Sequence, residues 1–393
     1  MEVKQIASLL NDVIAEQVGE EATLLNEDLS NVVDVGRSVF NATSYDKFTK
    51  ALVDRIGRVI FVDRKYEGVA PSVIYDGFEF GSVLEKIGSE IPEYTENETW
   101  DLTGGQSYDP NVFYAPSVYA KFFSRYVTFE VPLSIADKQA KSAFTSAQEL
   151  TRLVNMLFGK VDQAMSLAEE SLVMRTINGG IAETIYADYG ATDIGDSSGV
   201  KAINLLYLWN QAHSGNELTK EQALANPEFI RFASVEMMKV ANRLKKVTTL
   251  FNVGGKKRFT PMANLKIVLH SDFSANAKAY LYSDTFHDEY VKLPKADEVP
   301  YWQGSGDDYD IDETTAINVK LPSDNTKTVA CDGIIGCMFD EEACGVLNFE
   351  RYTTSQYNGK AEFTNYWHKQ KACQFLDLNE NFVVFLVNDD TGE

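Results

Sequence analysis

The stretch SAQELTRLVNMLFGKVDQAMSLAEESLVMRTINGG, residues 146–180, decides the fold predicted for this 393-residue chain. It opens with Ser146 and Glu149 in the spacing of a capping box, and it closes on Asn178-Gly179-Gly180, a pattern typical of a helix end. Between these signals, apolar residues recur at helical spacing for about 30 residues, which predicts an amphipathic helix roughly 45 Å long. They are Leu150, Leu153, Val154, Leu157, Val161, Ala164, Met165, Ala168 and Leu172. Such a helix forms a spine against which other elements pack.

The segments before this helix predict two projecting arms. Residues 1–50 contain a short amphipathic helix around Leu10 and an acidic stretch from Glu20 to Asp28, and we expect this N-terminal arm to be stable only when laid across another surface. Residues 58–63 are a strand candidate, whereas residues 64–116 are rich in Gly, Pro, Tyr, Glu and Asn. An extended segment then returns over residues 119–133. In a strand, residues two or four positions apart lie on the same face, and the apolar residues with this spacing are Phe123, Val127, Phe129 and Val131. This order indicates an arm that leaves the body and returns.

The segments after the spine alternate between helix and strand. Residues 181–225 are interpreted as connecting structure, and a helix is predicted from Pro227 to Leu244. Three further elements follow: a buried strand at 265–269, a helix at 274–282 and an apolar strand at 381–387. The predicted class is therefore α+β, in two or three lobes.

Composition excludes several classes of function. The net charge is −22, so the average surface repels polyanions such as nucleic acids. The nearest basic cluster, Lys256-Lys257-Arg258, follows Gly254-Gly255, and a solvated loop is favoured over a phosphate site. No apolar run reaches the roughly 20 residues that span a membrane, and the N-terminus lacks an apolar signal core. We therefore expect a soluble protein made in the cytosol.

No constellation of catalytic residues emerges from the motifs. The sequence contains neither Gly-x-Ser-x-Gly nor a phosphate-binding loop, and its four histidines lack metal-peptidase spacing. Residues 307–313 hold alternating aspartates, but Glu313 and Val319 break the calcium-loop register, so a solvated acidic loop is favoured over an ion site. We expect no enzyme activity, no cofactor and no metal. The remaining candidate ligands are interpreted as surface or satisfied histidines and as reduced core thiols: His213, His270, His287, His368, Cys331, Cys337, Cys344 and Cys373.

Aromatic residues in loops have two open interpretations. They could anchor an interface with another protein, because they bury a large area at little entropic cost, or they could pack within their own lobe. The candidates are Tyr94, Tyr108, Tyr114, Tyr301 and Trp302.

One short run carries a resemblance to a known family. Residues 48–60 resemble the start of the conserved body of major capsid proteins from small short-tailed phages that use protein-primed replication. In that family a leucine-valine-aspartate-arginine-isoleucine-glycine run precedes the first strand of the body. The same run is formed here by Leu52, Val53, Asp54, Arg55, Ile56 and Gly57. Further stretches are similar in the same order: residues 78–91 with a helix-like segment at 83–87, residues 127–177 leading into the spine helix, and residues 366–373 and 381–387 as closing strands.

The resemblance implies the Hong-Kong-97-type capsid fold. Its parts are an N-terminal arm (1–52), an extended loop with flanking strands (53–135), a peripheral domain with the spine helix (136–225), an axial domain (226–345) and returning strands (346–393). Neither an appended immunoglobulin-like domain nor a cleaved scaffolding leader is expected.

The function implied by the resemblance is self-assembly. Pentamers and hexamers would form an icosahedral phage head that encloses double-stranded DNA without binding it specifically. A scaffolding protein during assembly and a portal at one vertex would be the partners, with no membrane involved; assembly would occur in the host cytoplasm and the product would be the virion capsid. The alternatives are an encapsulin-like shell that houses a cargo enzyme, and an acidic α/β enzyme whose carboxylates are dispersed in the sequence.

Overall fold

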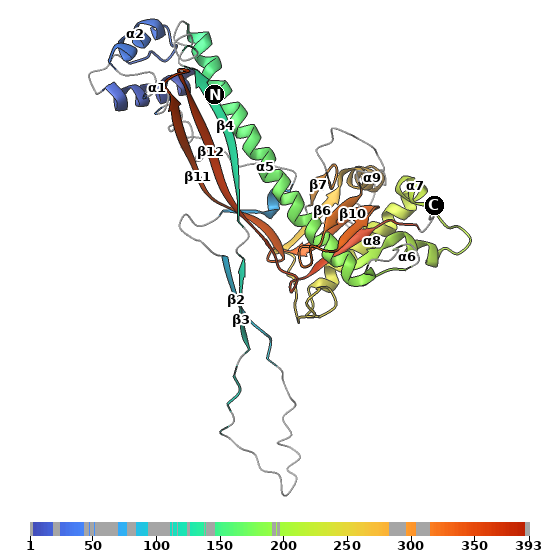
Figure 1. Ribbon diagram of the computed structural model, residues 1–393. Helices are drawn as coiled ribbons and strands as arrows, with labels where there is room; N and C mark the ends of the chain where they lie inside the picture. Colours follow the sequence, from blue (N-terminus) through green and yellow to red (C-terminus); the bar gives the residue numbers. More distant parts are fainter. Residues whose placement is uncertain are drawn as a thin grey trace.

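The computed structural model describes residues 3–18, 24–42, 70–76, 84–92, 113–115, 117–123, 126–136, 146–190, 197–282, 296–303 and 315–389, with single residues 47, 51, 111, 138 and 194. Its axis is the spine helix α5 (Ala147–Tyr189), beside which a long β-ribbon runs (Figure 1). A helical unit lies at one end of α5 and a compact α/β unit at the other, while a narrow β-hairpin projects from between them (Figure 1). The predicted α+β class and long spine are confirmed.

The N-terminal unit consists of α1 (Val3–Val18) and α2 (Val32–Ala42); α1 packs on α2 and on α5. The Asn11 side chain fixes the turn between the helices, because it donates to the carbonyl of Leu25 over 2.9 Å and accepts from the Leu25 N–H over 2.6 Å. Leu10, Val13 and Ile14 are thereby fully buried in their own chain. The surface on which the arm lies is therefore α5 of its own chain, and α2 covers part of the apolar face of α1.

The long sheet has the strand order β1-β11-β12-β4. Its central strands, β11 (Cys344–Asn358) and β12 (Phe363–Leu376), pair antiparallel over most of their length. β4 (Tyr126–Ala136) joins β12 at one edge, and the short β1 (Ile74–Asp76), preceded by the 3-10 turn Pro71–Val73, pairs with β11 at the other. Along β4 the predicted face is confirmed, because Val127, Phe129 and Val131 alternate with exposed neighbours and the first two pack toward the core.

The compact unit is built on a five-stranded sheet of order β5-β13-β10-β6-β7. The strands are β5 (Ala202–Asn204), β13 (Phe382–Leu386), β10 (Ile334–Asp340), β6 (Leu265–His270) and β7 (Asp297–Val299). Successive residues of a strand face opposite sides, so each strand contributes to two cores. Phe382 and Val384 face α5, whereas Val383 and Phe385 face the helices of the other layer. These helices are α6 (Leu205–Ala212), α7 (Lys220–Ala225), α8 (Pro227–Leu244) and α9 (Ser271–Tyr282).

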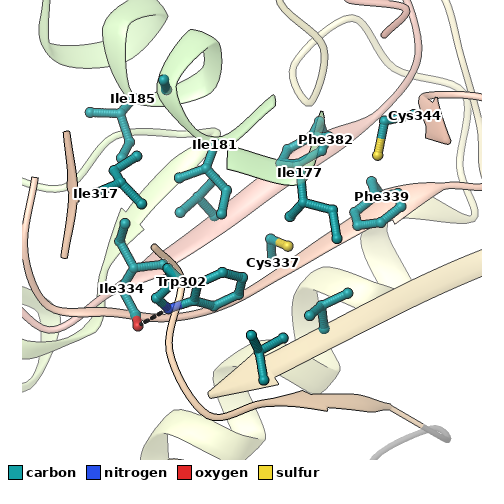
Figure 2. Packing of buried hydrophobic residues seen from close by; sticks show 14 of the residues in the cluster. Ile177, Ile181, Ile185, Trp302, Ile317, Ile334, Cys337, Phe339, Cys344 and Phe382 are labelled. Carbon is teal, nitrogen blue, oxygen red and sulfur yellow. Dashed lines mark hydrogen bonds between the residues drawn. The ribbon is translucent and has the colours of Figure 1, made fainter. Parts of the chain in front are cut away.

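The core between α5 and this sheet contains Ile177, Ile181 and Ile185 of the helix and Cys337 and Phe339 of β10 (Figure 2). Trp302 closes it from a loop; it is fully buried and its indole N–H donates to the carbonyl of Ile334 over 2.8 Å (Figure 2). The core-packing alternative therefore holds for Trp302, while Tyr114 is exposed. A small hairpin of β8 (Ile317–Lys320) and β9 (Thr328–Cys331) packs against the same helix.

The predicted helix end at Asn178-Gly179-Gly180 is wrong, because α5 continues to Tyr189. The glycines serve close packing instead. A Cβ atom on Gly180 would lie 2.6 Å from Cε2 of Phe382, and one on Gly179 would lie 2.9 Å from Cγ of Pro322. Gly180 lets α5 lie close to β13, and Gly179 lets it lie close to the turn between β8 and β9.

Residues 181–225 are likewise more ordered than predicted. They hold the last turns of α5, strand β5 and helices α6 and α7, rather than connecting structure alone. Helix α8, strand β6, helix α9 and strand β13 lie close to their predicted positions. The helical pattern predicted for α8 runs through Phe232, Val235, Met238 and Leu244, but its buried face includes Phe229, Ala233 and Met237, and Val235 is exposed.

We predict that Gly180→Ala destabilises the chain although alanine favours a helix interior over glycine. The new methyl group would overlap the buried ring of Phe382, which stacks on Phe339 with centroids 5.0 Å apart. The expected loss is about 1–3 kcal/mol in the free energy of unfolding, measured by urea denaturation. Ser171→Ala on the exposed side of α5 is the control, and equal stability of the two variants would contradict the close-packing account.

A second prediction concerns His368 in β12, which is 4% exposed with its Nδ1 atom 3.0 Å from the hydroxyl of Thr353. Burial, together with the nearby Arg351, lowers the pKa of His368 to about 4. As pH falls from 7 toward 4, the unfolded chain gains a proton that the folded chain does not, so stability decreases by roughly 2–3 kcal/mol. His368→Gln should remove this part of the pH dependence in urea titrations at several pH values. An unchanged slope in the variant would contradict the assignment.

Candidate functional site

The projecting hairpin is formed by β2 (Leu84–Ser89) and β3 (Val118–Phe123), which pair antiparallel. Directly opposed residues share a face, so Lys86 and Lys121 lie on one side of the hairpin, and Ile87 and Ala120 lie on the other. The sequence analysis predicted an arm here, and the returning strand is confirmed. The helix-like interpretation of residues 83–87 is wrong, because cross-strand pairing holds the described part of this segment as a strand. The candidate outgoing strand at 58–63 lies outside the described residues.

The inner face of the arm binds a pair of carboxylates on the body. The Lys86 ammonium lies 3.1 Å from Oδ2 of Asp377 and 2.7 Å from Oε1 of Glu380, and it also contacts Glu342 at 3.0 Å. Lys121 reaches the other oxygen of Asp377 at 2.8 Å. The Asp377 side chain is completely buried. These carboxylates lie where the two sheets meet, in the connection between β12 and β13 and beside the turn between β10 and β11. We call this group the ion cluster.

The loop that contains Lys256, Lys257 and Arg258 completes the seat of the arm. Arg258 Nε lies 3.0 Å from Glu380 Oε1, and its guanidinium also donates to the hydroxyl of Tyr119 on β3. Lys256 forms an ion pair with Glu90, next to the end of β2. The predicted solvated loop is therefore only partly correct: Lys257 is exposed, while its two neighbours hold the arm.

The ion cluster is charged at neutral pH. Burial raises the pKa of Asp377, but the hydrogen bond from Lys121 and the charge of Lys86 outweigh burial and hold this pKa below its usual value. Burial would lower the pKa of Lys86, but hydrogen bonds to Glu380 and Glu342 raise it above its ordinary value. Each partner thus stabilises the charged form of the other.

The outer face of the arm is exposed and mostly apolar, although Glu85 and Ser89 also lie on it. Val118, Ile87 and Phe122 are 63%, 67% and 61% exposed, and they lie on the side opposite the two lysines. Phe113 and Tyr114, just before β3, are more exposed still. A cluster of large apolar side chains on a narrow projection is typical of a surface that binds another protein.

The described residues offer no candidate metal centre: no group of three or more His, Cys, Asp or Glu side chains among them could hold an ion. The acidic loop at 307–313 lies outside this part of the chain. The four cysteines are buried free thiols, as predicted, and burial raises the pKa of Cys331 to about 12. Within the described helices, none is long and apolar enough to cross a bilayer.

The residues singled out by sequence and those singled out by structure differ. The run from Leu52 to Gly57 lies outside the described residues, so its role stays a prediction. The ion cluster was missed because Lys86 and Asp377 are far apart in sequence and only the fold brings them together. A lysine followed by an exposed apolar residue in each strand, Lys86-Ile87 and Lys121-Phe122, is the signal that could have identified a two-faced hairpin.

Comparison with known proteins decides the family. The model of the family described as "Phi29-like phage major capsid protein" matches residues 10–386. The chain belongs to this family. It is therefore a phage major capsid protein, as the resemblance implied, and the mixed α+β architecture agrees with the expected Hong-Kong-97-type fold. Its place is the capsid of the virion, assembled from many copies, and nothing supports the encapsulin alternative.

Solved structures that match this chain include the capsid of Staphylococcus phage Andhra, with 9% identity over 82% of this chain and 84% of that chain and a TM-score of 0.44. A chain in the structure of the head fiber and inner core protein of bacteriophage P68 has 11% identity over 80% and 83%, with a TM-score of 0.45. The capsid of cyanophage P-SCSP1u has 10% identity over 83% and 88%, with a TM-score of 0.41. No curated protein is detectably similar in sequence.

We predict that Lys86→Met weakens the attachment of the arm to the body. The substitution leaves the buried carboxylates of Asp377 and Glu380 without their shared cation, which costs about 3 kcal/mol when a buried pair is broken. Hydrogen exchange in residues 84–92 and 117–123 of the capsid protein should become faster, while the compact unit stays protected. Lys320→Met, which removes an exposed lysine from β8, is the control. Equal protection of the arm in both variants would show that the ion cluster does not hold it.

Proposed function

We propose that this major capsid protein assembles as pentamers and hexamers into an icosahedral head, with the β2–β3 arm of each copy lying over a neighbouring copy. The observation that carries the proposal is the apolar outer face of the arm at Ile87, Val118 and Phe122, opposite the side that binds the body. A neighbouring subunit would remove this surface from water, which is the dominant favourable term in association.

The arm is suited to this role because contacts within its own chain fix its direction before a neighbouring copy binds. The ion cluster and the pairing of Arg258 with Tyr119 seat the base of the arm, so less conformational freedom is lost when a neighbour binds. An interface of about 1,600 Å² between two copies need be only moderately tight, because closure of a shell links each contact to many others. In this proposal the five-stranded unit lies near the capsomer centre, and the long sheet with α5 lies at the periphery.

The remaining partners are those that the family implies. A net charge of −22 makes the protein a poorly adhesive container for double-stranded DNA, which it would enclose without specific contacts. A separate scaffolding protein would guide assembly in the host cytoplasm, and a portal would occupy one vertex. The protein would act by packing and not by catalysis.

Size-exclusion chromatography and negative-stain images of the expressed protein test self-assembly. We expect capsomers or closed particles, and nuclease-protected DNA within particles from infected cells. A compact monomer with catalytic turnover would overturn the proposal. Particles filled with a cargo protein instead of DNA would favour an encapsulin-like shell.

The role of the arm has its own test. Ile87→Ser combined with Phe122→Ser should leave the fold intact, because both side chains are exposed in the single chain, yet it should abolish particles. Val200→Ser, which removes a half-exposed apolar side chain outside the arm, is the control for reduced surface hydrophobicity. Normal particles from the double variant would contradict the proposed contact.

A further inference from the structure

The loop between α8 and β6 has two faces, and one of them seats the arm. Thr248 and Arg258 exchange backbone hydrogen bonds of 2.9 and 3.0 Å, which hold the two sides of the loop together. Arg258 donates to the hydroxyl of Tyr119 on β3, and Lys256 forms an ion pair with Glu90. Both partners lie on the inner face of the arm, with the lysines of the ion cluster, because residues two positions apart in a strand share a face.

The opposite face of this loop is mostly apolar and open to solvent. In an antiparallel pair the residues next to a directly opposed pair point to the other side, so Val247 and Phe259 are cross-strand neighbours on the face away from the arm. Both side chains are about half exposed. Lys257 is exposed on the same face, and Leu250, three residues beyond Val247, adds a further exposed apolar side chain. We call these four residues the loop face.

The loop face complements the outer face of the arm. Each has three large exposed apolar side chains and one exposed charge, and the two charges are opposite, Glu85 on the arm and Lys257 on the loop. Residues 239–258 contain seven basic residues and no acidic residue, in a chain whose net charge is −22. The loop is therefore attracted to other copies of this acidic chain. In such an interface, apolar area gives affinity and charge selects the partner.

The two faces point in opposite directions at the same level of the molecule. The arm, the side chains of Lys256 and Arg258, and the loop follow one another in one stack, with Glu380 of the ion cluster bound to Arg258. The outer face of the arm forms one side of this stack, and the loop face forms the other. They cannot meet within one chain, because the inner face of the arm lies between them. Copies arranged in a ring would bring them together at one radius.

We propose that the outer face of the arm of one copy binds the loop face of the next copy in the same capsomer. This inference rests on the proposed assembly and names the surface that receives the arm. The contact joins two different surfaces of identical chains, which is the type of interface that closes rings. Glu85 would lie near Lys257, and the apolar side chains of both faces would be removed from water. Nucleic acid would pair with Lys257 but would leave these apolar side chains exposed.

Polar substitutions on the loop face test its role. Val247→Ser combined with Phe259→Ser should leave the fold intact, because both side chains are about half exposed in the single chain, yet it should prevent the formation of particles. Val235→Ser, which removes an exposed apolar side chain from the adjoining helix α8, is the matched control and should assemble like the wild type. Circular dichroism and urea denaturation of each variant before assembly show whether the chain is folded.

Cysteine cross-linking identifies the partner surface directly. The four natural cysteines are buried, so Ile87→Cys and Phe259→Cys introduce exposed thiols. A chain that carries both substitutions should, after assembly and treatment with a short bis-maleimide, give a ladder of covalent species on a denaturing gel that ends at the pentamer or hexamer. A mixture of the two single variants should give dimers that contain one chain of each kind, and either single variant alone should remain monomeric on the gel.

Charge reversal gives a third readout. Lys257→Glu and Glu85→Lys should each raise the protein concentration at which particles form by about threefold, since like charges then oppose each other at the contact. The variant with both substitutions restores opposite charges and the original net charge, and it should assemble like the wild type.

The outcomes separate this inference from the proposed function. If the wild type forms no capsomers or particles, the proposed assembly fails. If the arm variant Ile87→Ser, Phe122→Ser forms no particles but the loop-face variant forms them normally, or if the double-cysteine particles give no ladder, the inference is wrong while the proposed role of the arm stands. Normal particles that lose their DNA in the Lys257→Glu variant would overturn the inference in favour of a nucleic-acid contact.

Discussion

Asp377 carries a buried negative charge at the junction of the two sheets, and the lysines of the arm neutralise it. An uncompensated charge in this position is expensive, so the folded body favours the state in which the arm is seated. The constraint works in both directions: the carboxylates hold the base of the hairpin, and the hairpin allows the carboxylates to be buried. The direction of the arm is therefore a property of the single chain, established before any other copy is present.

The spine helix provides the second constraint. Its first half runs beside the long sheet, and its second half forms one layer of the compact unit, so one rigid element fixes the distance between the ends of the molecule (Figure 1). Gly179 and Gly180 allow the helix to pass directly against Pro322 and Phe382. The junction that bears Asp377 is thus held between the spine and two sheets, and a seat of this rigidity suits a protein that must meet its neighbours at set angles.

Sequence patterns predicted the helices and strands that have a strong apolar periodicity. They missed the features that depend on contacts between residues far apart in the sequence. The apolar face of α5 and the apolar runs of β6 and β13 are local signals, and these elements lie close to where they were expected. Asn178-Gly179-Gly180 has the composition of a helix end, but the identity of Phe382 as its neighbour is invisible in the local sequence. The same holds for the N-terminal unit, where α2 covers α1, and for Lys86, whose partners lie near the C-terminus. The family run from Leu52 to Gly57 indicated the capsid family without indicating what these residues do.

The central claim is that the arm of each copy is preorganised by the ion cluster and buries its apolar face on a neighbour. A cryo-electron microscopy reconstruction of assembled particles tests it most directly. The account predicts that Ile87, Val118 and Phe122 lie in contact with a second copy while Lys86 and Lys121 still contact Asp377 of their own chain. A closed shell in which this face remains in solvent, or in which the arm folds back on its own body, would contradict it.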